Sequence, residues 1–141
     1  MDCGLTCATK AKKSYPETDE TGTFWVSTIL DTDSRLRAAR GIDKDETQST
    51  ENAFRMLQRR GHPDEPPPLI SDGWGGIDDA LINVYGNVPE YSGQGRPPTR
   101  LKPAQHWLYL QMIKHRDEHG HLINIELKAV WGKLDELIAL L

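Results

Sequence analysis

The chain has 141 residues, the length of one domain, and 37% of them are hydrophobic, which suffices for a buried core. A formal net charge of −4 at pH 7 excludes a uniformly basic nucleic-acid coat protein but is compatible with a local basic patch. No apolar run approaches the roughly 18 residues of a membrane span, and the first residues lack a signal-peptide pattern. We therefore expect a cytoplasmic protein with no membrane partner.

Residues 1–22 are predicted to form a weakly structured lead-in, because lysines are followed by an acidic, turn-rich stretch without clear periodicity. This segment contains both cysteines, Cys3 and Cys7, which are too few for a disulfide scaffold. Their spacing matches none of the usual zinc-binding pairs. We therefore interpret the histidines farther along the chain as solvated rather than as zinc ligands: His106, His115, His119 and His121.

Residues 23–141 alternate between strand and helix patterns. β-Branched and aromatic residues at 23–31 predict a strand, which a polar turn joins to a second strand at 36–42. A helix is expected to begin near Asp45 and to end before Gly61, because acids open it and arginines close it. Its apolar stripe consists of Ala53, Phe54 and Leu57, and its N-cap candidates are Thr47, Ser49 and Thr50.

Shorter elements follow a proline-rich connection. The patterns predict a buried strand at 69–72, a helix at 77–85, a two-stranded hairpin at 106–114 and 121–131, and a final helix at 134–141. The final helix has an apolar stripe, and three tryptophans are assigned to the core: Trp25, Trp74 and Trp131. This order of elements predicts a mixed α/β fold built on a central sheet.

Asp72 is the most informative acid of the chain. It ends a predicted buried strand and precedes glycines, and open α/β sheets bind ligands at the carboxyl ends of their strands. A carboxylate there suits a hard cation such as Mg²⁺, whereas a turn or N-cap aspartate is the alternative interpretation. Asp31 and Asp33 also follow a strand, but their setting is typical of a turn. Asp78 and Asp79 open a predicted helix, whose dipole explains them.

A basic loop occupies residues 92–103. It contains Arg96, Arg100 and Lys102 and no acid, and Trp107 and Tyr109 follow it. Cations combined with aromatic rings are suited to phosphate contacts and base stacking, although a solvated loop leading into a half-buried strand has the same composition. Taken alone, these patterns predict a soluble α/β domain that acts on phosphate.

Several ordered blocks of the sequence resemble DDE-type insertion-sequence transposases of the small prokaryotic kind. The blocks are residues 15–34, 70–78 (ISDGWGGID), 95–100 (GRPPTR) and 114–120 (KHRDEHG), and the resemblance covers about residues 10–141. It implies an RNase H-like mixed sheet with flanking helices and cut-and-join chemistry on DNA. In that family three acids hold two Mg²⁺ (or Mn²⁺) ions that activate the attacking oxygen and stabilise the leaving oxygen.

The resemblance also implies which residues form the catalytic and metal site. Asp72 matches the second acid, and Asp2 occupies the place of the first. Residues 3–9 lack the expected strand pattern, and a short frame excursion between Asp2 and Lys10 is our hypothesis for that difference. The third acid, a helical Glu, is expected beyond Leu141. The chain is therefore expected to be a transposase fragment, incomplete at its N- and C-termini and inactive alone.

Three functional hypotheses follow. The first is a fragment of a DNA transposition enzyme that acts on transposon ends and target DNA. The second is a non-catalytic module that uses Arg96, Arg100 and Lys102 to bind DNA, or that pairs with another copy or with intact transposase and inhibits it. The third is an active metal nuclease that combines Asp72 with other acids of this chain: Asp31 and either Glu126 or Glu136.

Overall fold

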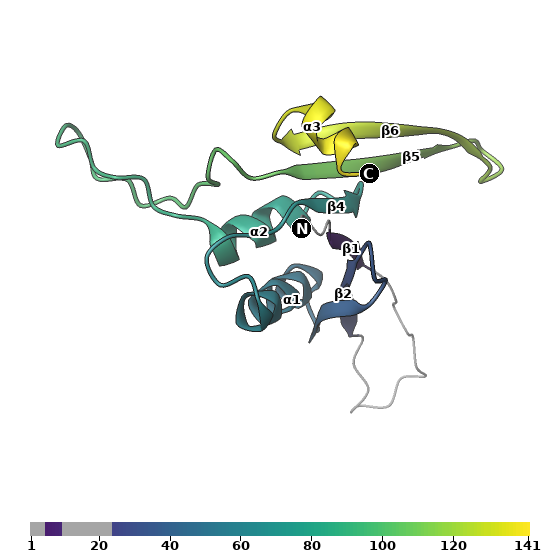
Figure 1. The fold of residues 1–141 in the computed structure, drawn as a ribbon, viewed down its shortest axis with the longest axis horizontal. Coiled ribbons are helices and arrows are strands. Elements are labelled where there is room, and N and C mark those ends of the chain that lie inside the picture. The colour runs from purple at the N-terminus through teal and green to yellow at the C-terminus, as the bar shows by residue number, and fades with distance from the viewer. Residues whose placement is uncertain (1–4, 10–23) are drawn as a thin grey trace.

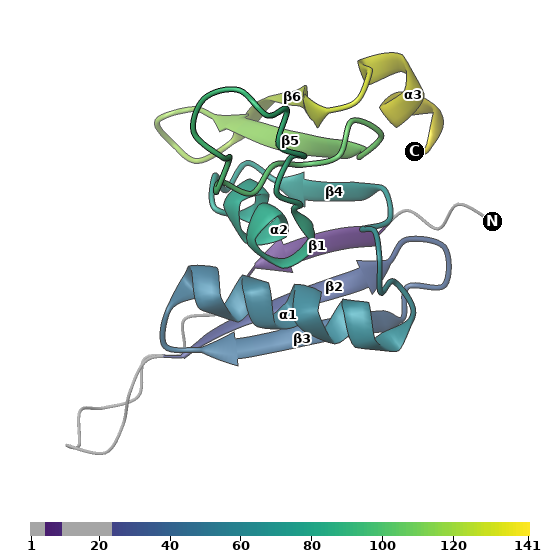
Figure 2. The same ribbon diagram turned by 90° about the vertical axis from the view of Figure 1, so that its left-hand side faces the viewer.

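The computed structural model describes residues 5–9 and 24–141, and the side chains of 24–141 only. Its strands belong to one sheet, drawn from two directions in Figures 1 and 2. The elements are β1 (Leu5–Thr9), β2 (Trp25–Asp31), β3 (Arg37–Asp43), α1 (Glu46–Arg60), β4 (Leu69–Asp72), α2 (Ile77–Tyr85), β5 (Tyr109–Arg116), β6 (Leu122–Trp131) and α3 (Leu134–Ala139). The predicted mixed α/β fold is therefore confirmed. No helix in the described part of the chain is long and apolar enough to cross a membrane.

The six strands follow the order β3-β2-β1-β4-β5-β6 across the sheet. The hairpin β2–β3 is antiparallel, and β2 is also antiparallel to β1. Strands β1, β4 and β5 run parallel to one another, whereas β6 folds back antiparallel onto β5. Since β3 runs in the same direction as β1 and β4, the carboxyl ends of four strands lie at one end of the sheet.

Residues 5–9 form a central strand rather than a weakly structured lead-in. Cys7 pairs with Ile29 of β2 on one side and with Ser71 of β4 on the other. A strand with two neighbours gains both rows of backbone hydrogen bonds, so tertiary pairing outweighs its weak local pattern. The rest of the predicted lead-in lies outside the described residues.

Helices α1 and α2 lie side by side and cover one face of the sheet (Figures 1 and 2). The predicted apolar stripe of α1 is buried there against the sheet, and Trp74 and Trp131 pack partly buried against the same core. Trp25 is half-buried. Leu137 alone of the stripe predicted for the last helix is buried, so α3 covers little of the sheet. The core contains Ile29, Ala39, Ala53, Phe54, Leu57, Leu69, Ile77, Ala80, Leu81, Tyr85, Trp107 and Tyr109.

Asp45 begins α1, because its side chain accepts a hydrogen bond from the Gln48 N–H at 2.9 Å. The predicted N-cap candidates were therefore wrong: Ser49 and Thr50 are buried and hydrogen-bond to Ser27 instead. These bonds seat α1 directly on β2 and β3, where Gly41 permits the close approach. A Cβ atom at Gly41 would lie 1.8 Å from the carbonyl oxygen of Ser49.

Candidate active site at the carboxyl end of β4

Asp72 is the last residue of β4 and lies beside Met112 of β5. Its Oδ1 accepts a hydrogen bond from the Trp74 N–H at 3.2 Å, so it also shapes the turn that follows. The side chain is half-buried and opens onto a cavity of about 400 Å³. Asp72 is therefore a turn aspartate whose carboxylate also reaches solvent, and its role as a metal ligand stays a prediction.

A buried polar network holds the backbone on either side of Asp72. The Tyr109 hydroxyl lies 2.7 Å from Ser71 Oγ and accepts a bond from Gln111 Nε2 at 3.0 Å. Two further hydrogen bonds connect this network to the backbone of the turn. Ser71 Oγ donates to the Asp72 carbonyl, and Gln111 Nε2 donates to the Trp74 carbonyl. A satisfied buried network of this kind restricts local motion, so the Asp72 carboxylate is presented on a rigid turn.

Glu46 is a second carboxylate at the same end of the sheet. It opens α1, three residues after the carboxyl end of β3, which lies at the same end of the sheet as Asp72. Burial raises the pKa of the Glu46 carboxyl above 4.5, and the negative charges of Asp72 and Asp45 raise that pKa further. Glu46 is not recognisable as part of this end of the sheet from the sequence, because it looks like an ordinary first-turn acid and its place relative to Asp72 depends on strand order.

Basic side chains line the other side of the cavity beside Asp72. Lys114 and Arg116 of β5 contribute to its lining together with Met112 and Trp74. The cavity thus combines a carboxylate with two cations in one solvent-accessible space. Such a space can accept a phosphate group, whose oxygens are attracted to the cations, next to a carboxylate, which is the ligand type that hard metal ions prefer.

Asp72 supplies carboxylate oxygens, the ligands that a hard divalent cation prefers. Glu46 adds negative charge at the same end of the sheet, and the repulsion that contributes to its raised pKa is the kind that a bound cation relieves. No group of three His, Cys, Asp or Glu side chains in the described residues is arranged to hold a metal ion. Asp2 lies outside the described residues, so its pairing with Asp72 stays a prediction.

Asp31 lies at the opposite end of the sheet from Asp72. It pairs with Leu5, whose other neighbour, Leu69, begins β4, whereas Asp72 ends β4. Its carboxylate accepts hydrogen bonds from the N–H groups of Asp33 and Ser34 and from the Ser34 hydroxyl. These bonds, led by that of the Ser34 hydroxyl, lower the pKa of Asp31, which matches the turn role predicted for it.

The nuclease hypothesis that joins Asp31 to Asp72 is therefore wrong. The other carboxylates of this hypothesis do not replace Asp31 as a partner of Asp72. Glu126 on β6 lies 2.8 Å from His115, and Glu136 is exposed on α3. Asp78 and Asp79 lie in the first turn of α2, as predicted from the helix dipole.

The basic loop projects from the side of the sheet that α1 and α2 cover (Figure 1). Arg96, Arg100 and Lys102 are all exposed on it, and Asn87 and Lys102 close its base through two backbone hydrogen bonds. Trp107 and Tyr109, the expected stacking platforms, are instead buried in the core, where Trp107 packs 5.4 Å from Trp131. The loop therefore offers cations without base-stacking rings from these two residues.

Each of the histidines weighed as zinc ligands lies beside a carboxylate, and the rings of His119 and His121 are 6.3 Å apart between centroids. His106 lies 2.8 Å from Glu65, and His121 lies 3.2 Å from Asp117. All four histidines have more than half of their side chains exposed. The cysteine part of that set is not tested, since Cys3 and the Cys7 side chain lie outside the described part of the chain.

Comparison of the chain with family models, with curated proteins and with solved structures finds no significant match.

Proposed function

We propose that this chain is part of an RNase H-like, metal-dependent DNA-cleaving and DNA-joining enzyme of the DDE transposase type. The observation that carries the proposal is the position of Asp72, at the carboxyl end of a central strand and at a cavity that Lys114 and Arg116 also line. The resemblance of the sequence assigns a metal-binding acid to the same residue. A mixed sheet with helices packed on it agrees with that assignment.

Asp72, together with the other acids that the resemblance implies, would hold the Mg²⁺ or Mn²⁺ ion, which supplies charge stabilisation at the phosphodiester when it is bound. The side chains of this chain have separate tasks. Lys114 and Arg116 attract the phosphate oxygens into the cavity, and the buried Tyr109 network keeps Asp72 in place.

The exposed cations of the basic loop are the proposed DNA contacts outside the cavity. Arg96, Arg100 and Lys102 can neutralise backbone phosphates at a distance from Asp72, because the loop extends away from the sheet (Figure 1). A non-catalytic binding module is the second candidate function. It is favoured by the three exposed cations of the basic loop, which can bind phosphate without a metal ion.

Metal binding at Asp72 can be tested without relying on activity. Mn²⁺ added to the protein should broaden the amide NMR signals of residues around Asp72 and Glu46, and Asp72→Asn should remove that broadening. Asp79→Asn is the matched control, since Asp79 is an exposed acid on α2. Broadening that is the same in the wild type and in Asp72→Asn would contradict a metal site at this position.

DNA binding and cleavage distinguish the two candidate functions. We expect salt-sensitive binding of a DNA duplex that is lost when Arg96, Arg100 and Lys102 become Ala, without nicking of supercoiled plasmid. Metal-dependent nicking that disappears in Asp72→Asn would show instead that this chain is active alone. A chain that binds neither DNA nor Mn²⁺ would refute both candidate functions.

A further inference from the structure

A groove between the outer strand β3 and helix α1 carries three arginines. Arg40 comes from β3, whereas Arg55 and Arg59 lie one helical turn apart on α1, and together they line an open hollow of about 360 Å³. We call it the arginine groove. It is distinct from the cavity beside Asp72 and from the basic loop, since it shares no lining residue with either.

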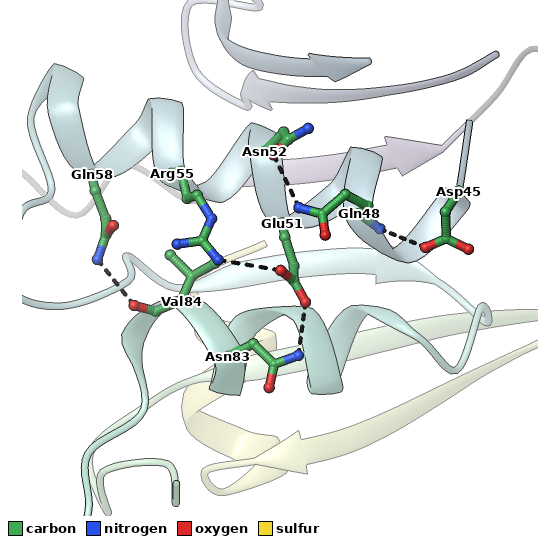
Figure 3. Close-up of polar contacts among 8 residues, drawn as sticks. All are labelled: Asp45, Gln48, Glu51, Asn52, Arg55, Gln58, Asn83 and Val84. Atoms are coloured by element: carbon green, nitrogen blue, oxygen red, sulfur yellow. Dashed lines mark hydrogen bonds and ion pairs between the residues drawn. The ribbon is translucent and has the colours of Figure 1, made fainter. Parts of the chain in front are cut away.

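The positive charge of the arginine groove is only partly compensated. Arg55 donates to Glu51 at 3.3 Å, and Asn83 of α2 donates to the same carboxylate at 2.7 Å (Figure 3). Glu51 thus lies between α1 and α2, bonded to both residues, with its side chain 12% exposed. Arg40 and Arg59 are exposed, and no acid of the described residues forms an ion pair with either.

This concentration of charge opposes the composition of the whole chain. The net charge of the protein is −4, yet residues 35–60 carry seven Lys and Arg against four Asp and Glu. Like charges that share a groove repel one another, and an anion bound between them removes that repulsion. Guanidinium groups are suited to this role, because their planar donors match the geometry of phosphate oxygens.

The rest of the lining indicates which kind of anion binds. The Arg40 N–H, on the outer edge of the sheet, already donates to Met56 Sδ at 3.5 Å, and Asn52 Nδ2 donates to the Ile42 carbonyl at 3.5 Å. Side chains of α1 thus occupy two backbone groups of β3 that an added peptide strand would need, and Arg60 occupies a third, the Ala38 carbonyl. None of the seven lining residues is aromatic, so the groove has no platform for a base.

We propose that the arginine groove is a further phosphate-binding site, which holds the sugar–phosphate backbone of DNA without reading its bases. Its binding of phosphate follows from the groove itself, whereas the assignment to DNA rests on the proposed function. The domain would then contact DNA at three separate places: the cavity beside Asp72, the basic loop and the arginine groove. Backbone contacts of this kind add affinity and fix orientation but carry no sequence information.

The first test uses pyrophosphate as the probe. We expect titration with pyrophosphate to shift the amide NMR signals of Arg40, Asn52 and Met56 in the wild-type chain. The double variant Arg40→Gln/Arg59→Gln should lose these shifts, whereas Arg96→Gln/Arg100→Gln, with the same change in charge, should keep them. Groove signals that do not move in the wild type, or that move equally in the groove variant, would overturn the proposal.

The second test measures binding of a fluorescein-labelled duplex of about 20 base pairs over roughly 50 to 200 mM salt. Each lost phosphate contact lowers the slope of log affinity against log salt by about 0.9, so the groove variant should lose about 1 to 2 from its slope. Affinity at the low-salt end should fall about tenfold. DNA binding identical to that of the wild type would overturn the assignment to DNA, even if pyrophosphate binds.

Two controls keep the result interpretable. Arg40→Lys/Arg59→Lys preserves both charges and should retain most of the slope. Both arginines are exposed, so all variants should unfold at the same urea concentration as the wild type. Failure of the proposed function is seen separately, because loss of the Mn²⁺ effect at Asp72 would leave the pyrophosphate result unchanged.

Discussion

Asp31 is the last residue of β2 and Asp72 is the last residue of β4, yet the two lie at opposite ends of the sheet. Leu5 of β1 pairs with Asp31 on one side and with Leu69 on the other, and Asp72 lies three residues beyond Leu69. Those three steps alone correspond to about 10 Å along the strand. A carboxylate at the end of a strand therefore joins a site only when strand direction brings it to the correct end of the sheet.

The coupling of Glu46 to Asp72 can be measured directly. Removing the Asp72 charge in Asp72→Asn should lower the pKa of Glu46 toward 4.5, because that charge is one of the causes of the raised value. The measurement is a pH titration of the Glu46 carboxyl by NMR. Asp79→Asn should leave the Glu46 pKa unchanged, and an unchanged pKa in Asp72→Asn would show that the two carboxylates do not interact.

The raised Glu46 pKa also predicts how stability depends on pH. A folded-state pKa above 4.5 means that the folded protein holds the Glu46 proton more tightly, so the free energy of unfolding falls as pH rises through this range. Glu46→Gln removes this penalty and should be more stable than the wild type at pH 7, although the helix dipole favours a charged first-turn residue and limits the gain.

The same difference should vanish below the unfolded-state value of 4.5, where Glu46 is protonated in both states. Urea unfolding of both proteins at pH 7 and at about pH 3.5 tests this expectation. Glu90→Gln, at an exposed loop position, is the control and should show no such pH-dependent difference. A Glu46→Gln protein that is less stable at pH 7 would reverse the inferred sign.

The buried network around the Tyr109 hydroxyl should contribute measurably to stability. Tyr109→Phe removes the two buried hydrogen bonds that the hydroxyl makes with Ser71 and Gln111, which together should contribute about 1 to 3 kcal/mol. Urea unfolding gives the difference. Tyr91→Phe is the matched control, because the Tyr91 hydroxyl bonds to Gly95 on an exposed loop and its loss should cost under about 0.5 kcal/mol. Equal costs in the two variants would refute a structural role for the network.

Gly41 is predicted to tolerate no side chain. A Cβ atom there would meet the Ser49 carbonyl and the Ala53 nitrogen, which belong to the backbone of α1 and cannot move independently. Gly41→Ala should therefore lower the free energy of unfolding by about 3 kcal/mol or more. Gly75→Ala, where no atom lies within 4 Å of the new carbon, is the control for thermal unfolding. Normal stability of Gly41→Ala would mean that α1 does not pack as closely as described.

Local signals in the sequence account for most of the elements. The strand Leu69–Asp72 and the helix Ile77–Tyr85 agree with their predicted bounds, because glycines and prolines delimit short apolar segments. Strand β1 could not be predicted, since residues 5–9 become a strand through partners on β2 and β4 that are remote in sequence. The same limit applies to Trp107, whose burial depends on contacts with Tyr85 and Trp131.

The site was predictable only in its central residue. Asp72 is apparent from its place between an apolar strand and glycines, whereas Glu46 becomes its neighbour only through the direction of β3. The arginine groove was equally hidden, because Arg40 is separated from Arg55 and Arg59 in sequence and meets them only when α1 packs against β3. The order and direction of the strands therefore determine which side chains lie near a residue such as Asp72 or Arg40, and the local sequence does not show them.

The central place of β1 has a consequence for the order of folding. The hairpin β2–β3 and α1 make contacts between near neighbours in sequence, but almost half of the chain separates Leu5 from its parallel partner Leu69. Strands β3, β2 and β1 join strands β4, β5 and β6 only through the pairing of β1 with β4. This pairing has the entropic cost of closing a long loop before its contacts stabilise the sheet. During synthesis, one edge of β1 therefore remains unpaired until β4 has emerged from the ribosome. We expect the complete sheet to form late in folding.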